Sequence, residues 1–273
     1  MSIFSGKSAV VTGGASGIGR AVCEALAAEG AVVTVADLDG SGAEAVAQGI
    51  RVRGGRAEGR PLDVRDAAAV AKVVGDAAAG HGRLDYLFNN AGIAIMGEER
   101  HVTLDDWDRV LGVDLHGVVH GVRAAYPIMV AQGSGHIVNT ASVAGLVPAA
   151  MEISYTTAKY GVVGLSHALR GEGKGLGVKV SVVCPGFIDT PILQTSPIRG
   201  GGDRQKFLSL IPWRMLPDRA ARVILDGVAK NRATIVVTRH AKLLWALHRL
   251  SPDAGIWLSA RVVERVRKII REG

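Results

Sequence analysis

The alternation of short apolar segments with longer amphipathic ones constrains this chain more than any other feature. Runs such as SAVVTG (8–13), AVVTVAD (31–37) and VKVSVVCPG (178–186) are rich in β-branched residues and end in glycine or a turn residue. Buried strands have this composition, and segments with a helical period separate them. Apolar strands that alternate with helices are typical of a parallel sheet covered on both faces.

The full pattern predicts seven strands and the helices between them. Because crossovers between parallel strands are right-handed, we expect an α/β fold with a doubly wound, Rossmann-like sheet of order 3-2-1-4-5-6-7. Residues 1–238 then form one domain, and 239–273 form a basic amphipathic helical extension packed on that domain or on a subunit interface. The predicted strands cover 8–13, 31–37, 56–64, 83–92, 135–142, 178–186 and 233–238. The predicted helices cover 17–29, 42–54, 66–81, 105–131 with a break near 112–117, 154–173, 217–230, 240–250 and 253–271.

Charge and composition narrow the classes of function. The net charge of +7 is spread along the chain except in 239–273, which has eight basic and three acidic residues. No aromatic-and-basic recognition pattern accompanies them, so we expect a solvated basic face and no nucleic-acid partner. Weak peripheral contact with a membrane surface is the alternative for this tail.

Several features predict a cytoplasmic protein. The N-terminus has no charged segment followed by an apolar one, and no apolar run approaches ~18 residues. Cys23 and Cys184 fall in apolar periodic segments, where buried reduced thiols are expected.

A glycine-rich loop follows the first predicted strand. It reads TGGASGIG, with Gly13, Gly17 and Gly19 in a G-x3-G-x-G spacing. Gly13 permits a tight turn, Gly17 lets the backbone approach a pyrophosphate, and Gly19 lets the helix pack on the sheet. A turn that only reverses the chain is the alternative.

A carboxylate ends the second predicted strand. Asp37 comes 18 residues after Gly19, where it can accept hydrogen bonds from ribose hydroxyls and would repel a 2′-phosphate. Ser16 offers no positive charge for such a phosphate. Both observations favour NAD over NADP, and a turn-capping role is the alternative for Asp37.

Polar residues end the third and fourth predicted strands as well. Asp63 can accept from an adenine amino group while Val64 packs on the ring. Asn90, with Ala91 and Gly92, ends the fourth strand, where its side chain can approach the adenosine ribose. Open α/β sheets bind ligands at the carboxyl ends of their strands. Each of these residues alone is also compatible with an ordinary turn.

Three further side chains suggest acid–base chemistry. Tyr155 and Lys159 share a helical face, and Ser142 ends the fifth predicted strand beside the cofactor loops. Tyr155 is the predicted general acid/base, and its ordinary pKa of ~10 must fall to near 7, which requires about 4 kcal/mol. The Lys159 ammonium and a positive nicotinamide are expected to supply this, and Ser142 to orient the reacting oxygen. For YxxxK alone, a snorkelling lysine is the simpler interpretation.

Taken together, TGGASGIG, Asp37, Asp63, NNAG (89–92), Ser142, YTTAK (155–159) and PGFIDT (185–190) resemble the short-chain dehydrogenase/reductase family over about 6–238. The resemblance implies a Rossmann-type domain, the same roles for the three residues above, and a homotetramer, or else a dimer, built on helices 105–131 and 154–173. The predicted cofactor contacts are Gly13, Ser16, Gly17, Ile18, Gly19, Asp37, Leu38, Asp63, Val64, Asn90, Ala91, Gly92, Tyr155, Lys159, Pro185, Gly186, Ile188 and Thr190.

One position departs from the family pattern. Where the family usually has VNLxG, this chain has VDLHG with Asp114. The family residue kinks the helix and completes a proton relay to Lys159 through water. Because Asp can also distort a helix through its backbone contacts, we include Asp114 among the catalytic residues and expect retained activity with an altered pH dependence. His116 and His120 lack a third ligand, so we predict packing roles and no metal.

The substrate loop is apolar, although ordinary lid packing would also explain it. An apolar alcohol or ketone suits this lining better than a sugar or a phosphorylated metabolite does. We therefore expect an NAD-dependent dehydrogenase for an apolar secondary alcohol or ketone. An NADPH-dependent reductase of acyl-type carbonyls and a non-catalytic dinucleotide sensor are the alternatives. The lid residues are Ile192, Leu193, Phe207, Leu208, Leu210, Ile211, Trp213 and Met215, which Ile95, Met96, Leu146 and Val147 are expected to face.

Overall fold

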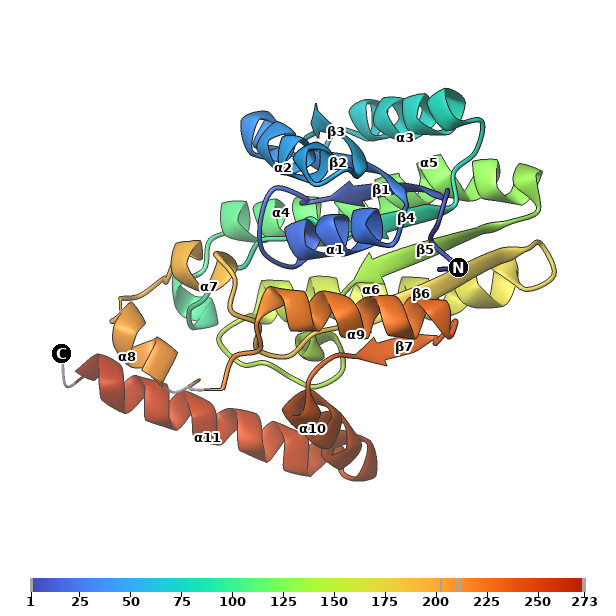
Figure 1. Ribbon diagram of the computed structural model, residues 1–273. Coiled ribbons are helices and arrows are strands. Elements are labelled where there is room, and N and C mark those ends of the chain that lie inside the picture. Colours follow the sequence, from blue (N-terminus) through green and yellow to red (C-terminus); the bar gives the residue numbers. More distant parts are fainter. Residues whose placement is uncertain (1, 202, 210, 212, 272–273) are drawn as a thin grey trace.

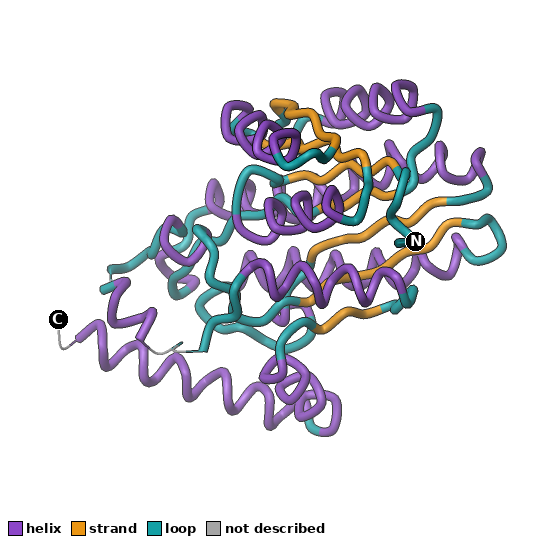
Figure 2. Tube along the Cα trace, in the orientation of Figure 1, coloured by secondary structure: helices purple, strands orange, loops and turns teal. Residues whose placement is uncertain are grey.

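Seven parallel strands form the central sheet in the order β3-β2-β1-β4-β5-β6-β7, which confirms the predicted topology (Figures 1 and 2). The computed structural model describes residues 2–271 except 202, 210 and 212. The predicted lid residue Leu210 therefore lies outside the described residues. The strands are β1 Ser8–Thr12, β2 Val32–Asp37, β3 Arg56–Pro61, β4 Tyr86–Asn89, β5 Gly135–Thr140, β6 Val178–Cys184 and β7 Thr234–Val236.

Helices cover both faces of this sheet. Side chains of α1, α2 and α9 share one hydrophobic core, and those of α3, α5 and α6 fill the opposite side. The helices are α1 Gly17–Ala28, α2 Gly40–Val52, α3 Ala67–His81, α4 Leu104–Leu111, α5 Gly117–Gln132, α6 Ile153–Gly173, α7 Ile192–Thr195, α8 Arg204–Ser209, α9 Pro217–Ala229, α10 Arg239–Leu250 and α11 Pro252–Arg271. Short 3₁₀ turns cover Glu99–His101 and Val143–Gly145.

The central strands show why the apolar segments of the sequence could be predicted as strands. Successive side chains of a strand point to opposite faces, and in β1 Ala9 and Val11 enter one core while Val10 enters the other. All three are fully buried. Because β1 is buried on both faces, its three central positions are apolar, and the polar Ser8 and Thr12 stand only at its ends.

All seven predicted strands are longer than the observed ones, and two of them show why. Residues 83–92 contribute only Tyr86–Asn89, because the residues that follow leave the sheet to form the site, and 56–64 contributes Arg56–Pro61. The latter is the edge strand β3, which is partly exposed and largely polar. The predicted helix break is confirmed: a π-helical turn at Gly112–His116 separates α4 from α5. Both cysteines are buried free thiols, as predicted.

The C-terminal extension runs along the edge of the fold that carries β7 and reaches α8 (Figure 1). Ala241 of α10 is fully buried in the core beneath β6 and β7. From α11, the Ser259 hydroxyl accepts a hydrogen bond of 3.0 Å from the Ala150 amide. In the part of the chain that the structure describes, no helix combines the length and apolarity that crossing a bilayer requires.

Candidate active site

The loop after β1 is a cradle that admits no additional side-chain atoms. Gly13 has φ +65°, and a Cβ there would lie 2.7 Å from the Ala91 Cα. A Cβ on Gly19 would overlap the Gly13 carbonyl oxygen. Since glycine adopts positive φ without strain and leaves room for close approach, the loop backbone is bare at the point where α1 begins.

The N-terminus of α1 has free amides for an anion. Ser16 occupies the N-cap in an extended conformation, and its side chain makes no capping hydrogen bond. The first amides of a helix lack partners within it, and the helix dipole favours a negative group there. The open cradle and these amides fit a dinucleotide pyrophosphate. Ile18 instead packs its side chain against the core.

Asp37 lies next to this cradle. Its carboxylate accepts hydrogen bonds from the Ala15 amide (3.0 Å) and the Asp39 amide (3.0 Å). These contacts aim the carboxylate at the loop from the end of β2, as a ribose-binding role requires. Leu38, the next predicted contact, is 72 % exposed and is therefore available at the rim.

Asn90 holds the site together rather than pointing freely into it. Its side-chain amide donates to the carbonyls of Thr12 (3.1 Å) and Gly13 (3.2 Å), while the Thr12 hydroxyl accepts from the amides of Asn90 and Ala91. Asn90 therefore has a structural role, and its approach to the cofactor ribose stays a prediction. Asn90 ties the loop after β4 to the loop after β1.

Asp63 also has a partner within the protein. Arg65 forms a bidentate ion pair with it, with contacts of 2.6 to 3.0 Å, and this pair lowers the pKa of the Asp63 carboxyl. Val64 is nearly buried and packs against Gly117. Adenine recognition by these two residues stays a prediction.

The three predicted catalytic side chains meet at the C-terminal end of β5. The Lys159 Nζ lies 5.3 Å from the centroid of the Tyr155 ring, and a hydrogen bond from Ser142 acts to lower the Tyr155 pKa. Ser142 also accepts a hydrogen bond from the Ala144 amide (3.1 Å), which fixes its side chain at the start of a 3₁₀ turn. The convergence expected from sequence is present.

Asp114 makes a direct ion pair with Lys159 rather than a contact through water alone. The Asp114 Oδ2 lies 2.9 Å from the Lys159 Nζ, and both side chains are buried. The other oxygen accepts from the Ile93 amide (2.8 Å), and Lys159 also donates to the Thr140 carbonyl (3.1 Å). Burial raises the pKa of Asp114, and the ammonium opposes this. The π-helical turn thus presents a carboxylate to Lys159.

The pKa of Tyr155 differs from the expectation. Burial raises it well above the ordinary value, and the negative charges of Asp114 and Glu152 raise it further. Lys159 forms a 2.9 Å ion pair with Asp114, and this negative charge opposes the lowering of the Tyr155 pKa that the ammonium alone would give. Acid–base catalysis needs a lower Tyr155 pKa, so another positive group near the phenol must supply most of that lowering.

Glu152 is a site residue that the sequence reasoning missed. It is the N-cap of α6, three residues before Tyr155, and burial raises the pKa of its carboxyl to about 7. It is the only charged residue between Ser142 and Lys159, which was the available signal.

The loop after β6 is held by a residue from the C-terminal extension. The His240 ring stacks on Phe187 with centroids 5.4 Å apart, and its Nε2 accepts from the Phe187 amide (3.2 Å). A Cβ on Gly186 would overlap this ring. The Pro185 carbonyl accepts from the Val143 amide (2.7 Å). This link between 185–187 and the tail was not predicted.

The last predicted positions of this loop reach the glycine cradle. The Thr190 side chain would lie 3.1 Å from a Cβ on Gly17, so the two loops touch. Ile188 is buried in the core, and its side chain therefore does not line the cleft surface. Gly92 closes the opposite side, since a Cβ there would lie 3.1 Å from the Asp114 Oδ2.

The substrate side is apolar, with corrections at three predicted positions. Met96 faces the lid segment as expected, since its amide donates to the Pro197 carbonyl (2.9 Å) and its carbonyl accepts from the Arg199 amide (2.7 Å). Ile95 instead packs with α4, α6 and Tyr155, and Leu146 packs in the core formed by α5, α6 and β6.

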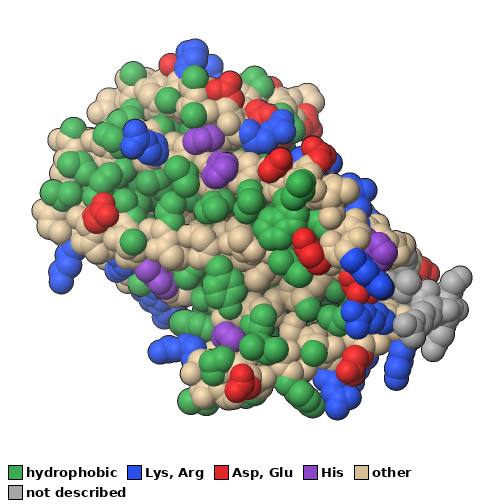
Figure 3. Space-filling model, turned by 180° about the vertical axis from the view of Figure 1, so that it is seen from behind, with side chains coloured by type: hydrophobic (Ala, Val, Ile, Leu, Met, Phe, Trp, Pro, Cys, Tyr) green, Lys and Arg blue, Asp and Glu red, His purple; other side chains and the backbone are tan. Residues whose placement is uncertain are grey.

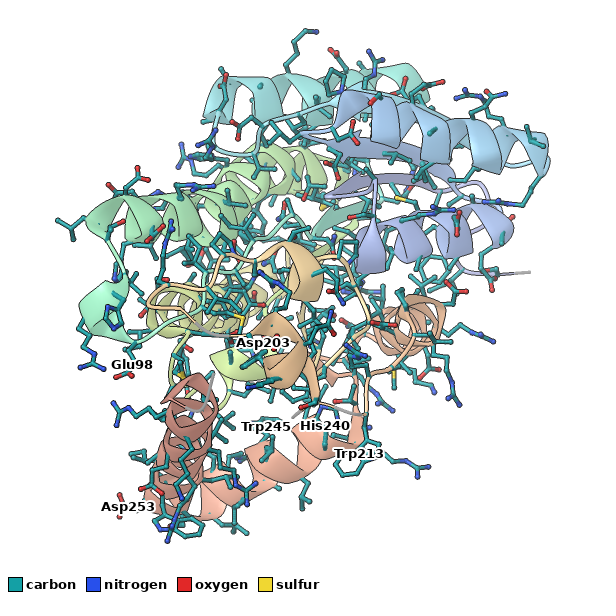
Figure 4. All side chains as sticks on the ribbon, turned by 90° about the vertical axis from the view of Figure 1, so that its left-hand side faces the viewer. Glu98, Asp203, Trp213, His240, Trp245 and Asp253 are labelled. Carbon is teal, nitrogen blue, oxygen red and sulfur yellow. The ribbon has the colours of Figure 1, made fainter. Side chains whose placement is uncertain are left out.

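Trp213 is 82 % exposed and points away from the protein body in Figure 4, so it does not belong to the apolar lining. Among the described residues, no group of three or more His, Cys, Asp or Glu is arranged to hold a metal ion. His120 Nδ1 bonds the Val64 carbonyl (2.9 Å).

The chain is similar to a known protein family and to several of its members. The family model described as short chain dehydrogenase matches residues 7–198. SadH of Mycobacterium tuberculosis (strain ATCC 25618 / H37Rv) is 36% identical over 255 residues, which is 92% of either chain. D-threitol dehydrogenase of Mycolicibacterium smegmatis is 40% identical over 187 residues, covering 68% of this chain and 72% of that one.

A solved structure is similar throughout. A short-chain dehydrogenase/reductase from Burkholderia phymatum, solved in complex with NAD, has a TM-score of 0.85 and 30% identity over 93% of this chain and 96% of its own. The chain belongs to the short-chain dehydrogenase family, an oxidoreductase family with a Rossmann-like fold.

Proposed function

We propose that this protein is an NAD-dependent dehydrogenase that interconverts a largely apolar secondary alcohol and its ketone. The observation that carries the proposal is the meeting of Ser142, Tyr155 and Lys159 beside the bare glycine cradle at one sheet edge. NAD bound there would accept or return the hydride. The chain's own residues handle the proton and the orientation of the substrate.

Tyr155 is the acid/base in this proposal. In alcohol oxidation its ionised oxygen takes the proton of the substrate hydroxyl, and in ketone reduction the neutral phenol gives that proton back. Ser142 donates a hydrogen bond to the reacting oxygen and holds it near Tyr155. Lys159, fixed by Asp114 and the Thr140 carbonyl, keeps its remaining donor capacity for the cofactor ribose.

Asp37 supports NAD rather than NADP. Its carboxylate is held beside the loop by two backbone amides and would repel a 2′-phosphate. Ser16 adds no compensating charge, and the similar Burkholderia phymatum protein was solved with NAD.

The apolar side chains of Ile93 and Ile95, which pack in one cluster with Tyr155, support a substrate with a hydrocarbon portion. Relatives include a D-threitol dehydrogenase and a meso-2,3-butanediol dehydrogenase, whose names denote polyols that carry secondary hydroxyl groups. A 3-oxoacyl-[acyl-carrier-protein] reductase of Thermotoga maritima is 34% identical over 222 residues. Asp37 disfavours NADPH and therefore that alternative, and the complete set of catalytic side chains disfavours a non-catalytic sensor.

A panel of hydrophobic alcohols and ketones tests the proposal. Cofactor reduction followed by absorbance should show turnover with NAD for at least one secondary alcohol. Tyr155→Phe should lower kcat by about 10³-fold without changing NAD affinity, because it removes the proton acceptor alone. NAD binding without turnover of any alcohol or ketone, combined with no effect of Tyr155→Phe, would refute the dehydrogenase function.

We also propose that the protein is a homo-oligomer. Hydrophobic side chains gather across the middle of the face seen in Figure 3, with few charged residues among them. On the outer sides of α4 and α6, Leu104 is 83 %, Ile153 42 % and Tyr160 40 % exposed. Light scattering after size-exclusion chromatography should give at least twice the monomer mass of 28.4 kDa.

A further inference from the structure

The inner face of helix α6 continues beyond the catalytic residues. Residues three and four apart along a helix share a face. The side chains of the N-cap and helix that follow this spacing are Glu152, Tyr155, Lys159, Val162 and Ser166. Those at the C-terminal end of this stripe, from Lys159 onward, are buried against the sheet. Ile153 and Tyr160, on the other side of the helix, are exposed.

The outer end of the stripe is partly exposed, and the Glu152 carboxylate is close enough to Tyr155 for its charge to raise the pKa of the phenol. Glu152 and Tyr155 are only half-buried, unlike Lys159. With a rise of 1.5 Å per residue, Glu152 lies about 4.5 Å farther along the helix axis from Lys159 than Tyr155 does. Because Lys159 is the residue nearest the cofactor loops, Glu152 lies on the side where the remainder of a substrate extends.

The backbone around Glu152 is fixed while its carboxylate is not engaged. Its amide donates to the Ala149 carbonyl (3.3 Å), and its carbonyl accepts from the Thr156 amide (2.7 Å). Met151 before it has φ +67°, a left-handed conformation that is costly for a side chain of this size. Within residues 2–271, leaving aside 202, 210 and 212, no hydrogen bond or ion pair engages the Glu152 carboxylate.

Without a partner, the ionised form of the Glu152 carboxyl is electrostatically unfavourable. The neighbouring residues 146–151, LVPAAM, carry no charge, and burial raises the pKa of the carboxyl to about 7. A carboxylate in apolar surroundings is stabilised by a hydrogen-bond donor. Among the described residues, the Glu152 oxygens are not fully buried, so a donor from outside the protein can reach them. One turn from Tyr155, a bound substrate can supply that donor.

We propose that Glu152 is a specificity-determining residue that accepts a hydrogen bond from a second donor on the substrate, a few bonds from the reacting carbon. The donor is a hydroxyl or an amino group. This inference rests on the proposed dehydrogenase function and narrows it to secondary alcohols that combine a hydrocarbon portion with one further polar donor.

Matched substrates on the full-length protein with NAD test this. Each set shares one carbon skeleton and comprises the secondary alkanol, the corresponding diol and the corresponding amino alcohol. The wild type should prefer the diol or the amino alcohol by at least about 10-fold in kcat/KM, since hydrogen bonds to charged groups are among the stronger ones. Glu152→Leu should bring that ratio close to one.

Two variants separate the donors and the site. Glu152→Gln keeps an acceptor without the charge, so it should retain preference for a diol and lose preference for an amino alcohol. Glu264→Gln removes an exposed acid on α11 and should keep the wild-type ratios. The NAD dissociation constant of each variant verifies the fold.

A ratio that is the same in the wild type and in Glu152→Leu would overturn the inference, as would a wild type that favours the plain alkanol. Turnover of alkanols with no such preference would leave the dehydrogenase function intact. Loss of all NAD-linked turnover across the sets, in the wild type itself, would refute the proposed function instead.

Discussion

At the sheet edge, the loops after β1, β2 and β4 form the proposed cofactor side. Contacts between backbone groups and short side chains connect these loops. Thr12 and Asn90 tie the loops after β1 and β4 together, and the Asp37 carboxylate binds the amide of Ala15. On the substrate side, long charged side chains connect segments distant in the sequence. Arg267 of α11 pairs with Glu98, and Arg199 pairs with Asp106, each through two hydrogen bonds. Figure 4 shows Glu98 near the end of α11.

This difference indicates how the two sides can change. The contacts on the cofactor side are so close that a single added carbon, such as a Cβ on Gly13 or Gly19, would overlap neighbouring backbone atoms. The contacts on the substrate side place whole segments, and ion pairs at the surface are individually weak. Substitutions on the cofactor side should therefore have large effects on NAD binding, and those on the substrate side small effects on KM.

The largest effect is expected for Gly19→Ala. The new Cβ would overlap the Gly13 carbonyl oxygen, so the cradle must open, and the NAD dissociation constant should rise about 100-fold or more. Calorimetric titration with NAD measures it. Gly80→Ala, in α3 where a Cβ meets no atom within 4 Å, is the matched control and should bind NAD as the wild type does. Unchanged affinity in Gly19→Ala would contradict the cradle.

Next in size is Asp37→Ala. Removal of the carboxylate takes away a ribose acceptor and the repulsion of a 2′-phosphate, so the ratio of kcat/KM for NAD over NADP should fall about 10- to 100-fold. Steady-state kinetics with both cofactors determine the ratio. Asp76→Ala, on the surface of α3, is the control. A ratio unaffected by Asp37→Ala would mean that this residue only caps a turn.

Asp114→Asn tests the catalytic centre, which lies between the cofactor side and the substrate side. The Asp114 charge raises the pKa of Tyr155, so its removal should lower that pKa. Alcohol oxidation needs ionised Tyr155 and is lost as pH falls through its pKa. The acidic limb of the kcat/KM profile should therefore move to lower pH, by about one pH unit. An unchanged profile would show that the Asp114 carboxylate has no part in proton transfer.

The smallest effect is expected for Arg267→Ala. It removes the ion pair that lowers the pKa of Glu98 to about 2 and that holds α11 against the loop after β4. Because such pairs contribute little, the alcohol KM should rise only about 2- to 5-fold, with NAD affinity unchanged. Arg265→Ala, exposed on the same helix, is the control. A large loss of NAD affinity in Arg267→Ala would contradict the division into two sides.

The same division explains what the sequence could predict. The cofactor side consists of residues within short motifs, such as Gly13 and Gly19, whose spacing carries their geometry. The substrate side depends on pairs that no local pattern reveals, since Arg267 and Glu98 are 169 residues apart and Ser259 and Ala150 are 109 apart.

The catalytic centre shows both situations. Ser142, Tyr155 and Lys159 were predicted to meet, because helical spacing and strand ends determine their places. The effect of Asp114 on Lys159 and Tyr155 could not be predicted in this way, since it depends on a 2.9 Å contact inside a π-helical turn. The position of Glu152 near Tyr155 could not be predicted either, since a single acid at the start of a helix is usually a capping residue.

The stacking of His240 on Phe187 has a consequence for shortened versions of this chain. A polypeptide that stops after β7 would keep every family motif and all seven strands, yet it would lack the ring that holds Phe187 and faces Gly186. The segment outside the shared family core thus helps to hold the loop after β6, which the proposed function places beside the cofactor. Removing this segment to obtain a shorter protein would leave the loop after β6 less firmly held. In the proposed function, the shortened protein would still need that loop to bind its cofactor.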